Sequence, residues 1–223
     1  MKIKWLGHSA FLIVSAAGVR IVTDPYQSGS YSGGLGYKPI RESADIVTIS
    51  HEHADHNYAG DIAGKPEIIR KTGKHEIKGI TIEGILTSHD QTNGRQRGLN
   101  TVFCMKVDGI RICHLGDLGH ELSGREQAEF GEVDVLMIPV GGFYTIDARE
   151  ATKVAAALRP KLVLPMHYKT PVLDFPITGV DAFVAAVEAA YTWPVRRRDK
   201  TEIEFGRATL PGGTEVWVLK HAL

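Results

Sequence analysis

The stretch Ile46-Val47-Thr48-Ile49-Ser50-His51-Glu52-His53-Ala54-Asp55-His56 places four possible metal ligands within six residues, directly after an apolar, β-branched run. In an extended turn, residues two apart point the same way, so His51 and His53 can share one ion. Asp55 and His56 then project toward a second, neighbouring position. Because four side chains so close in sequence cannot readily chelate one cation, the spacing favours two adjacent ions. Imidazole together with carboxylate suits Zn²⁺, Fe or Mn²⁺.

Three other strand-like segments end within two residues of a histidine or an aspartate. They are residues 80–87 before Ser88-His89, residues 110–115 before Gly116-Asp117, and residues 161–166 before His167. Layered α/β proteins gather functional side chains at the carboxyl ends of strands, where loops converge on a rigid sheet. A single histidine at a strand end is more often a hydrogen-bonded residue than a ligand, but four such ends together predict a shared site.

Composition places the chain among ordinary globular proteins. Of its 223 residues, 43% are hydrophobic and 23% are charged, which excludes wholesale disorder and a fibrous repeat. Lys+Arg and Asp+Glu each number 26, so no long-range field draws the chain to nucleic acid or to an anionic membrane. Apolar runs such as residues 133–140 fall short of the ~20 residues of a membrane helix, and no signal-like apolar core is visible. We expect a cytoplasmic protein that acts on a small molecule, with neither a membrane nor a nucleic acid as partner.

The expected fold is a layered α/β or α+β arrangement in one domain, residues 1–223. Short β-branched runs dominate the first two thirds of the chain, and helical patterns follow. Strands are predicted over residues 2–6, 10–14, 20–23, 46–50, 68–70, 75–77, 80–86, 101–107, 110–115, 133–140, 161–165, 202–205 and 215–219. Helices, each after a capping side chain, are predicted over Gly124–Phe130 after Ser123, Ala148–Leu158 after Asp147, and residues 182–191 after Asp181. Residues 196–198, all arginine, are interpreted as a solvated turn.

The cysteines are expected to face each other across a hairpin. Asp108-Gly109 supplies the positive φ angles of a tight two-residue turn. Counting outward from that turn places Cys104 opposite Cys113, close enough to crosslink. In a reducing cytoplasm we expect two buried thiols at this position rather than a disulfide.

Together these motifs resemble the metallo-β-lactamase superfamily. The segment His51-x-His53-x-Asp55-His56 matches its hallmark, and Thr23-Asp24-Pro25 matches its early aspartate. His89, Gly116-Asp117 and Pro165-Met166-His167-Tyr168 match its later ligand positions in the right order. The likeness covers essentially the whole chain and is greatest to small bacterial and archaeal metal-dependent hydrolases, which are related to L-ascorbate-6-phosphate lactonase.

The resemblance implies a four-layer αββα sandwich with a dinuclear site at one edge. It implies that His51, His53 and His89 hold one metal ion and that Asp117 bridges to the other, which is held by Asp55, His56 and His167. Zinc is the first expectation, with manganese or iron as alternatives. Two such ions lower the pKa of a bridging water from 15.7 to about 7 and so supply a hydroxide nucleophile. Asp55 and Asp117 are therefore expected to be catalytic.

Further residues are candidates for contact with the substrate. Arg95 and Arg97 lie between glycines shortly after His89, where a guanidinium pair would bind a phosphate or carboxylate, or would lie in a solvated loop. His120 is the stronger candidate for a catalytic general acid or oxyanion donor, and His8 fits that role or core packing equally well.

Two more features have alternative interpretations. Asp24 either orients a ligand imidazole through a hydrogen bond or is an ordinary turn residue. Residues 26–39 are rich in glycine and serine, and they form either a solvated connector or a mobile flap that carries Tyr26, Tyr31 and Tyr37 over the site.

The favoured function is a dinuclear hydrolase that acts on a small, anionic ester, lactone or phosphate. A phosphodiesterase or nuclease of the same fold is the alternative, made less favourable by the lack of room for long nucleic-acid-binding insertions. A redox di-iron protein would prefer a carboxylate where this chain has His53. A non-catalytic module would have lost ligands, whereas every ligand position is filled. The sequence leaves the substrate and the oligomeric state open.

Overall fold

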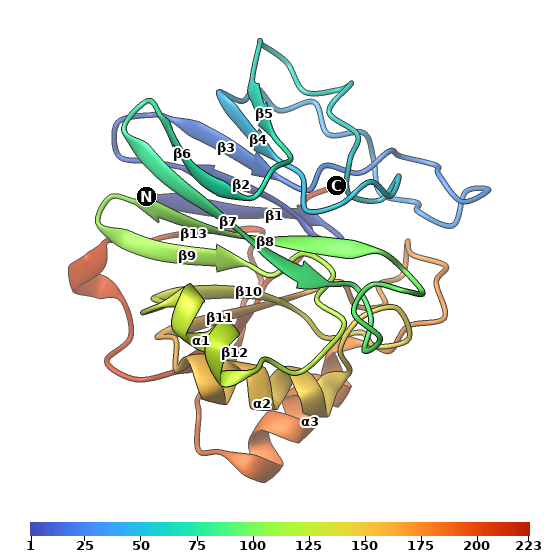
Figure 1. Cartoon of the computed structure of the whole chain (residues 1–223), viewed down its shortest axis with the longest axis vertical. Coiled ribbons are helices and arrows are strands. Elements are labelled where there is room, and N and C mark those ends of the chain that lie inside the picture. Colours follow the sequence, from blue (N-terminus) through green and yellow to red (C-terminus); the bar gives the residue numbers. More distant parts are fainter.

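The computed structural model describes residues 1–223 and folds them into two facing β-sheets with helices outside one of them (Figure 1). In spatial order, the six-stranded sheet contains β13 (Glu202–Glu204), β1 (Lys2–Gly7), β2 (Ala10–Val14), β3 (Arg20–Thr23), β4 (Ile46–Thr48) and β5 (Glu67–Ile69). The eight-stranded sheet contains β12 (Val195–Arg197), β14 (Glu215–Val218), β11 (Leu162–Met166), β10 (Val135–Pro139), β9 (Ile110–His114), β8 (Leu99–Val107), β7 (Ile80–Ser88) and β6 (Gly73–Ile77). Both sheets mix parallel and antiparallel pairs.

Three α-helices lie on the side of the eight-stranded sheet that faces away from the other sheet (Figure 1). They are α1 (Gly124–Phe130), α2 (Ala148–Leu158) and α3 (Val180–Ala190), and a short 3₁₀ helix, η1 (Arg207–Thr209), follows later. The predicted bounds of α1 and α2 are confirmed, and Ser123 and Asp147 each form a capping box. None of these helices has both the length and the apolar character that crossing a bilayer requires.

The main core fills the space between the sheets and continues under the helices. Alternate residues of the six-stranded sheet, such as Ile3, Ile13 and Ile21, belong to it together with buried strand residues of the eight-stranded sheet. Because side chains alternate along a strand, the intervening residues Leu12 and Val22 face the opposite side. The α/β sandwich predicted from the sequence is therefore confirmed.

The outer face of the six-stranded sheet differs in detail from the expected helical layer. Loop residues cover it, and they form a second apolar cluster that includes Tyr26, Leu35, Tyr37 and Phe175. The segment that contains the first three of these is rich in glycine, and four consecutive or near-consecutive residues, Gly29, Tyr31, Ser32 and Gly33, have positive φ, so it cannot continue as a helix. Within residues 26–39, the buried side chains of Tyr26, Leu35 and Tyr37 hold the segment on the sheet, and half of its residues are exposed.

Two local predictions were wrong at the C-terminal side of the chain. The N-cap of α3 is Gly179, and Asp181 pairs with Arg197 instead of capping the helix. Residues 195–197 form the edge strand β12, although residues 196–198 were expected to be a turn. Cross-strand contacts with β14 explain the strand, because Arg196 pairs with Glu215 at 2.6 Å.

The cysteine register was predicted correctly but the redox state was not. Cys104 lies directly opposite Cys113 in the β8–β9 hairpin, with Cα atoms 4.1 Å apart, and the two form a disulfide. Both residues are buried in the main core. The expectation of two free thiols is therefore corrected, because directly opposed residues of one hairpin bring their sulfur atoms into bonding contact.

Candidate metal centre

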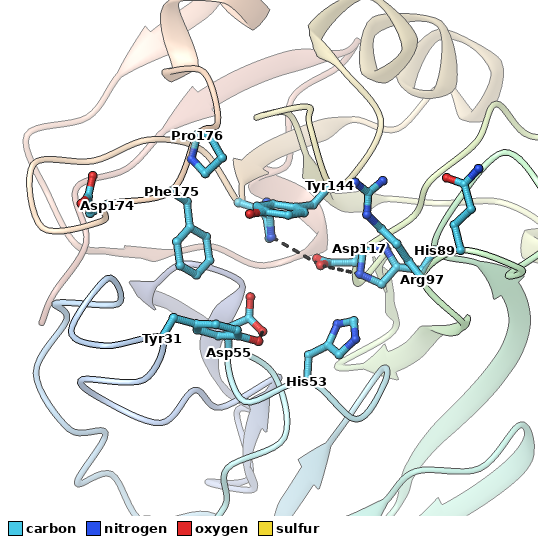
Figure 2. A pocket seen from close by; sticks show the side chains of 12 residues that line it. Tyr31, His53, Asp55, His89, Arg97, Asp117, Tyr144, Asp174, Phe175 and Pro176 are labelled. Carbon is cyan, nitrogen blue, oxygen red and sulfur yellow. Dashed lines mark hydrogen bonds and ion pairs between the residues drawn. The ribbon is translucent and has the colours of Figure 1, made fainter.

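The predicted ligands come together where strands of both sheets end. β4 of the six-stranded sheet leads to the histidine-rich segment, and β7, β9 and β11 of the eight-stranded sheet lead to His89, Asp117 and His167. Figure 2 shows His53, Asp55, His89 and Asp117 pointing into one cavity. The convergence predicted from the four strand ends is therefore present in the structure.

Asp117 lies at the centre of this cluster and is almost fully buried. Its Oδ1 is 3.2 Å from His56 Nε2, and its Oδ2 is 3.2 Å from His89 Nε2. The same Oδ2 is 3.4 Å from His167 Nε2 and 3.7 Å from His51 Nε2. One carboxylate thus faces four imidazoles, which is the position that a bridging ligand requires.

The ligand atoms form two principal groups on either side of Asp117. The first group contains His51, His53 and His89, whose ligand atoms lie within 4.8 Å of one another. The second group contains Asp55, His56 and His167 within the same limit. These are the two triplets that the family resemblance implied. The structure adds His8 to the second group.

The residues fit a metal ion because several of their polar atoms are buried without any hydrogen-bond partner. These atoms are His51 Nε2, His56 Nε2, His167 Nε2 and Asp117 Oδ1. A buried polar atom that lacks a partner costs free energy, so most such atoms in folded proteins are satisfied. Cations coordinated by these atoms would supply the missing partners.

The electrostatics of the cluster also suit cation binding. Burial lowers the pKa of His51 to about 3, so its imidazole is neutral and carries a free lone pair. Burial alone would raise the pKa of Asp117, but the imidazoles of His167 and His56 hold it well below its usual value. Burial would likewise raise the pKa of Asp55, but the nearby imidazoles, that of His56 above all, together lower it further than burial raises it, so Asp55 is ionised. The cluster therefore presents anionic oxygens at neutral pH.

Asp24 orients two ligands from the end of β3. Its Oδ1 accepts a hydrogen bond from the Ser50 backbone N–H at 2.8 Å, and its Oδ2 accepts one from the Ser50 hydroxyl at 2.5 Å. The same Oδ2 is 2.9 Å from His56 Nδ1, and Ser50 Oγ is 2.9 Å from His51 Nδ1. Contacts of this kind fix the ring orientation of metal-binding histidines. Of the two interpretations of Asp24, the geometry supports the orienting one.

Asn100 on β8 is a supporting residue that the sequence reasoning missed. Its Oδ1 accepts a hydrogen bond from the Asp117 backbone N–H at 3.0 Å, and its Nδ2 donates to the Leu115 carbonyl at 2.9 Å. Gly116 has a φ of +54°, and a Cβ there would lie 2.3 Å from Asn100 Oδ1. Any side chain at position 116 would clash with Asn100, so Gly116 is the feature of the sequence that indicates a close contact with the backbone beside Asp117.

A cavity of about 540 Å³ opens above the cluster (Figure 2). Tyr31, Tyr144, Phe175 and Pro176 form much of its wall. Arg97 also lines it, with its guanidinium carbon 5.4 Å from the centroid of the Tyr144 ring. Of the flap that residues 26–39 were considered to form, Tyr31 is the part that reaches the cavity, whereas Tyr26 and Tyr37 are buried.

Two predicted substrate-contacting residues lie elsewhere. Arg95 is exposed and is not among the residues that line the cavity. His120 does not line it either, since its Nε2 accepts a hydrogen bond from the Ser88 backbone N–H and its Nδ1 lies 3.0 Å from the Glu121 carbonyl oxygen. Both ring nitrogens of His120 are thus engaged, and the geometry gives this residue no access to a bound substrate.

Comparisons with known proteins agree with this geometry. The family model of the Beta-lactamase superfamily domain matches residues 2–167. A UPF0173 metal-dependent hydrolase from Thermococcus kodakarensis is 31% identical over 202 residues, covering 76% of this chain and 85% of that protein. Another from Methanosarcina barkeri is 31% identical over 218 residues, covering 85% and 91%.

A crystal structure from Thermotoga maritima gives the same result. That protein, assigned to the Zn-dependent hydrolases of the metallo-β-lactamase superfamily, has 35% sequence identity and a TM-score of 0.79. The match covers 98% of this chain and 97% of the other. With the ligand cluster in place, the chain belongs to the metallo-β-lactamase superfamily and is a metal-dependent hydrolase.

Proposed function

We propose that the chain is a dinuclear hydrolase that cleaves a small, anionic ester, lactone or phosphate. The observation that carries the proposal is the pair of ligand groups joined by Asp117 beneath a cavity whose rim bears Arg97. His51, His53 and His89 would hold one cation, and Asp55, His56 and His167 the other. The mixture of imidazole and carboxylate favours zinc and accommodates manganese or iron.

The protein's own residues prepare this site for hydrolysis. Two divalent cations, when bound, supply Lewis acidity and lower the pKa of water toward about 7. Asp117 remains ionised and faces both groups, so its carboxylate sets their separation. Asp24 and Asn100 hold ligand residues in place through hydrogen bonds, which limits reorganisation during the reaction.

Arg97 is the proposed binding residue for the anionic group. The carboxylate of Asp90, next to His89, accepts hydrogen bonds from the backbone N–H groups of Gln96 and Arg97 at 2.9 and 2.8 Å. It also binds Thr92 and Gly94, so one side chain organises the whole loop. An arginine held in this way can bind phosphate or carboxylate through two parallel hydrogen bonds. The cavity volume falls within the range of small-molecule sites, roughly 300–1,000 Å³.

The test combines metal analysis with a substrate panel. Purified protein loaded with Zn²⁺, Mn²⁺ or Fe²⁺ is expected to hold two cations per chain and to hydrolyse a small anionic ester, lactone or phosphate. Its neutral analogue should be a much poorer substrate. Cleavage of bis(p-nitrophenyl) phosphate and RNA but not of lactones would favour a phosphodiesterase instead. A chain that holds fewer than two cations would refute the dinuclear assignment.

A further inference from the structure

The carboxylate of Asp55 is held by two side chains from distant parts of the chain. The Tyr31 hydroxyl donates a hydrogen bond to Asp55 Oδ1 at 2.9 Å. On the other side, His8 Nε2 lies 3.1 Å from Asp55 Oδ2. Asp55 itself is buried; its contact with His8 is buried too, whereas its contact with Tyr31 is partly buried at the cavity. Neither His8 nor Tyr31 belongs to the two ligand triplets.

The contact from His8 has one consistent direction. An ionised carboxylate can only accept hydrogen bonds, so His8 Nε2 must carry the proton that it donates to Asp55 Oδ2. The ring is fully buried, and its Nδ1 has no partner. Ligating histidines usually donate from their second nitrogen to an acceptor, as the contact of His56 with Asp24 illustrates. His8 Nε2 is already directed at Asp55 Oδ2 and carries the proton of that hydrogen bond, so this nitrogen has no lone pair left for a cation. The geometry therefore favours a donor to Asp55 over a further metal ligand.

The backbone around His8 is built to hold this ring in place. His8 directly follows β1 and has a φ of +49°, a left-handed conformation that is costly for a residue with a side chain. Its ring packs against the rings of His167 and His56, with centroids 4.2 and 5.3 Å away. These neighbours both belong to the second ligand group, so the ring contacts of His8 concentrate on that side of the centre.

Tyr31 contacts the other oxygen of the Asp55 carboxylate. It lies between β3 and β4, and its side chain is about half exposed while its ring packs edge-on against Phe175 at 5.3 Å (Figure 2). The hydroxyl can therefore be removed with little disturbance of the core. Tyr31 is the member of the pair that also touches the cavity.

We propose that His8 and Tyr31 are positioning residues that fix the Asp55 carboxylate for the second cation. The inference rests on the proposed two-cation site and extends it to the residues that control the affinity of one position. With one donor on each oxygen, the carboxylate cannot rotate away from His56 and His167. The first position, formed by other side chains, does not depend on these two contacts.

The experiment measures the affinities of the two cations separately, by chelator competition with Zn²⁺ and by Co²⁺ titration followed in the visible spectrum. Tyr31→Phe removes one donor and keeps the ring. His8→Ala removes the other, and His8→Gln restores an N–H donor near the position of Nε2. Arg95→Ala serves as the control because its side chain is exposed and outside the cavity. Thermal unfolding of each metal-free variant reports whether it folds.

We expect Tyr31→Phe and His8→Ala each to weaken the second cation about 10–100-fold, as loss of a partner of a metal ligand usually does. The affinity of the first cation should stay within about twofold, and His8→Gln should recover part of the loss. Unchanged affinity in Tyr31→Phe would overturn the inference, even if His8→Ala does not fold. A large loss in His8→Ala with neither rescue by His8→Gln nor an effect of Tyr31→Phe would also overturn it and identify His8 as a ligand.

The wild-type titration separates this inference from the proposed function. If the wild-type chain binds fewer than two cations, the dinuclear assignment fails. If it binds two and the variants match it, only the positioning role fails.

Discussion

The two ligand groups differ in how firmly the protein holds them. In the second group, Asp24 contacts His56, and two donors contact Asp55, so two of its three ligands have polar support. In the first group, Ser50 supports His51, whereas His53 is only half-buried and His89 Nδ1 has no partner. One position is thus largely built before a cation arrives, and the other has more freedom to adapt. The two positions should therefore differ in affinity and in their response to pH.

The variant that affects both positions should have the largest effect. Asp117→Ala removes the carboxylate that faces His56, His89, His167 and His51. We expect kcat/KM to fall at least about 1,000-fold, which corresponds to roughly 4 kcal/mol of transition-state stabilisation. Steady-state kinetics, with circular dichroism as the folding control, would check this. A folded variant with undiminished activity would refute the assigned mechanism.

A variant of the first group alone should separate the two positions. His53→Ala removes a half-buried ligand, so the protein should fold, bind the second cation normally and lose the first. We expect activity to drop by about 100-fold or more, because one cation no longer polarises the substrate. Elemental analysis should show one cation per chain instead of two. His75→Ala, which changes a histidine outside the cluster, is the matched control and should retain both.

The two positions should also differ in the protons released when cations bind. Burial lowers the pKa of His51 and His53, so both are already neutral at pH 7. Burial has the same tendency at His56, but the carboxylates of Asp117 and Asp55 outweigh it and raise the pKa well above its usual value. Without a cation, His56 therefore holds a proton that coordination must displace.

These protonation states determine how the cation affinity of each position depends on pH. Binding at the second position should release about one proton at pH 7, so its affinity should rise as pH rises, by up to about tenfold per unit. At the first position, His51 and His53 are already neutral and have no proton to release near neutrality. Titration calorimetry in buffers of different ionisation enthalpy measures the released protons. Equal release at the two positions would contradict the comparison.

The smallest effect should come from a substitution at the rim of the cavity, because it changes no ligand of either cation position. Arg97→Ala removes the guanidinium group that lines the cavity, whereas Arg95→Ala changes an exposed arginine in the same loop. We expect KM for an anionic substrate to rise about tenfold in the first variant and to stay unchanged in the second, because only Arg97 can form the charge-assisted hydrogen bonds. Both variants should hold two cations. Equal KM values would remove Arg97 from the binding site.

The helices illustrate how far local sequence patterns carry. α2 begins as predicted because Asp147 and Glu150 form a capping box within one turn. It ends as predicted at Leu158, because its C-cap Arg159 directly precedes Pro160. Neither boundary needs a distant residue. The start of α3 was misplaced because Asp181 pairs with Arg197, a partner 16 residues away. The edge strand β12 was missed for a similar reason, since its pairing with β14 joins separate segments.

The same distinction applies to the metal centre. The histidine-rich segment and the strand ends before His89, Asp117 and His167 are local signals, so the sequence by itself determined the ligand types and a layered α/β or α+β domain, and the family resemblance added the sandwich. Only the tertiary structure decided that Arg97 rather than Arg95 lines the cavity, that His120 is engaged elsewhere, and that His8 and Tyr31 hold Asp55. The physical reason is distance along the chain. A predicted strand end indicates a ligand within two residues, so local sequence is enough to find it. A hydrogen bond across 47 positions, such as that from His8 to Asp55, forms only when packing brings the loops together.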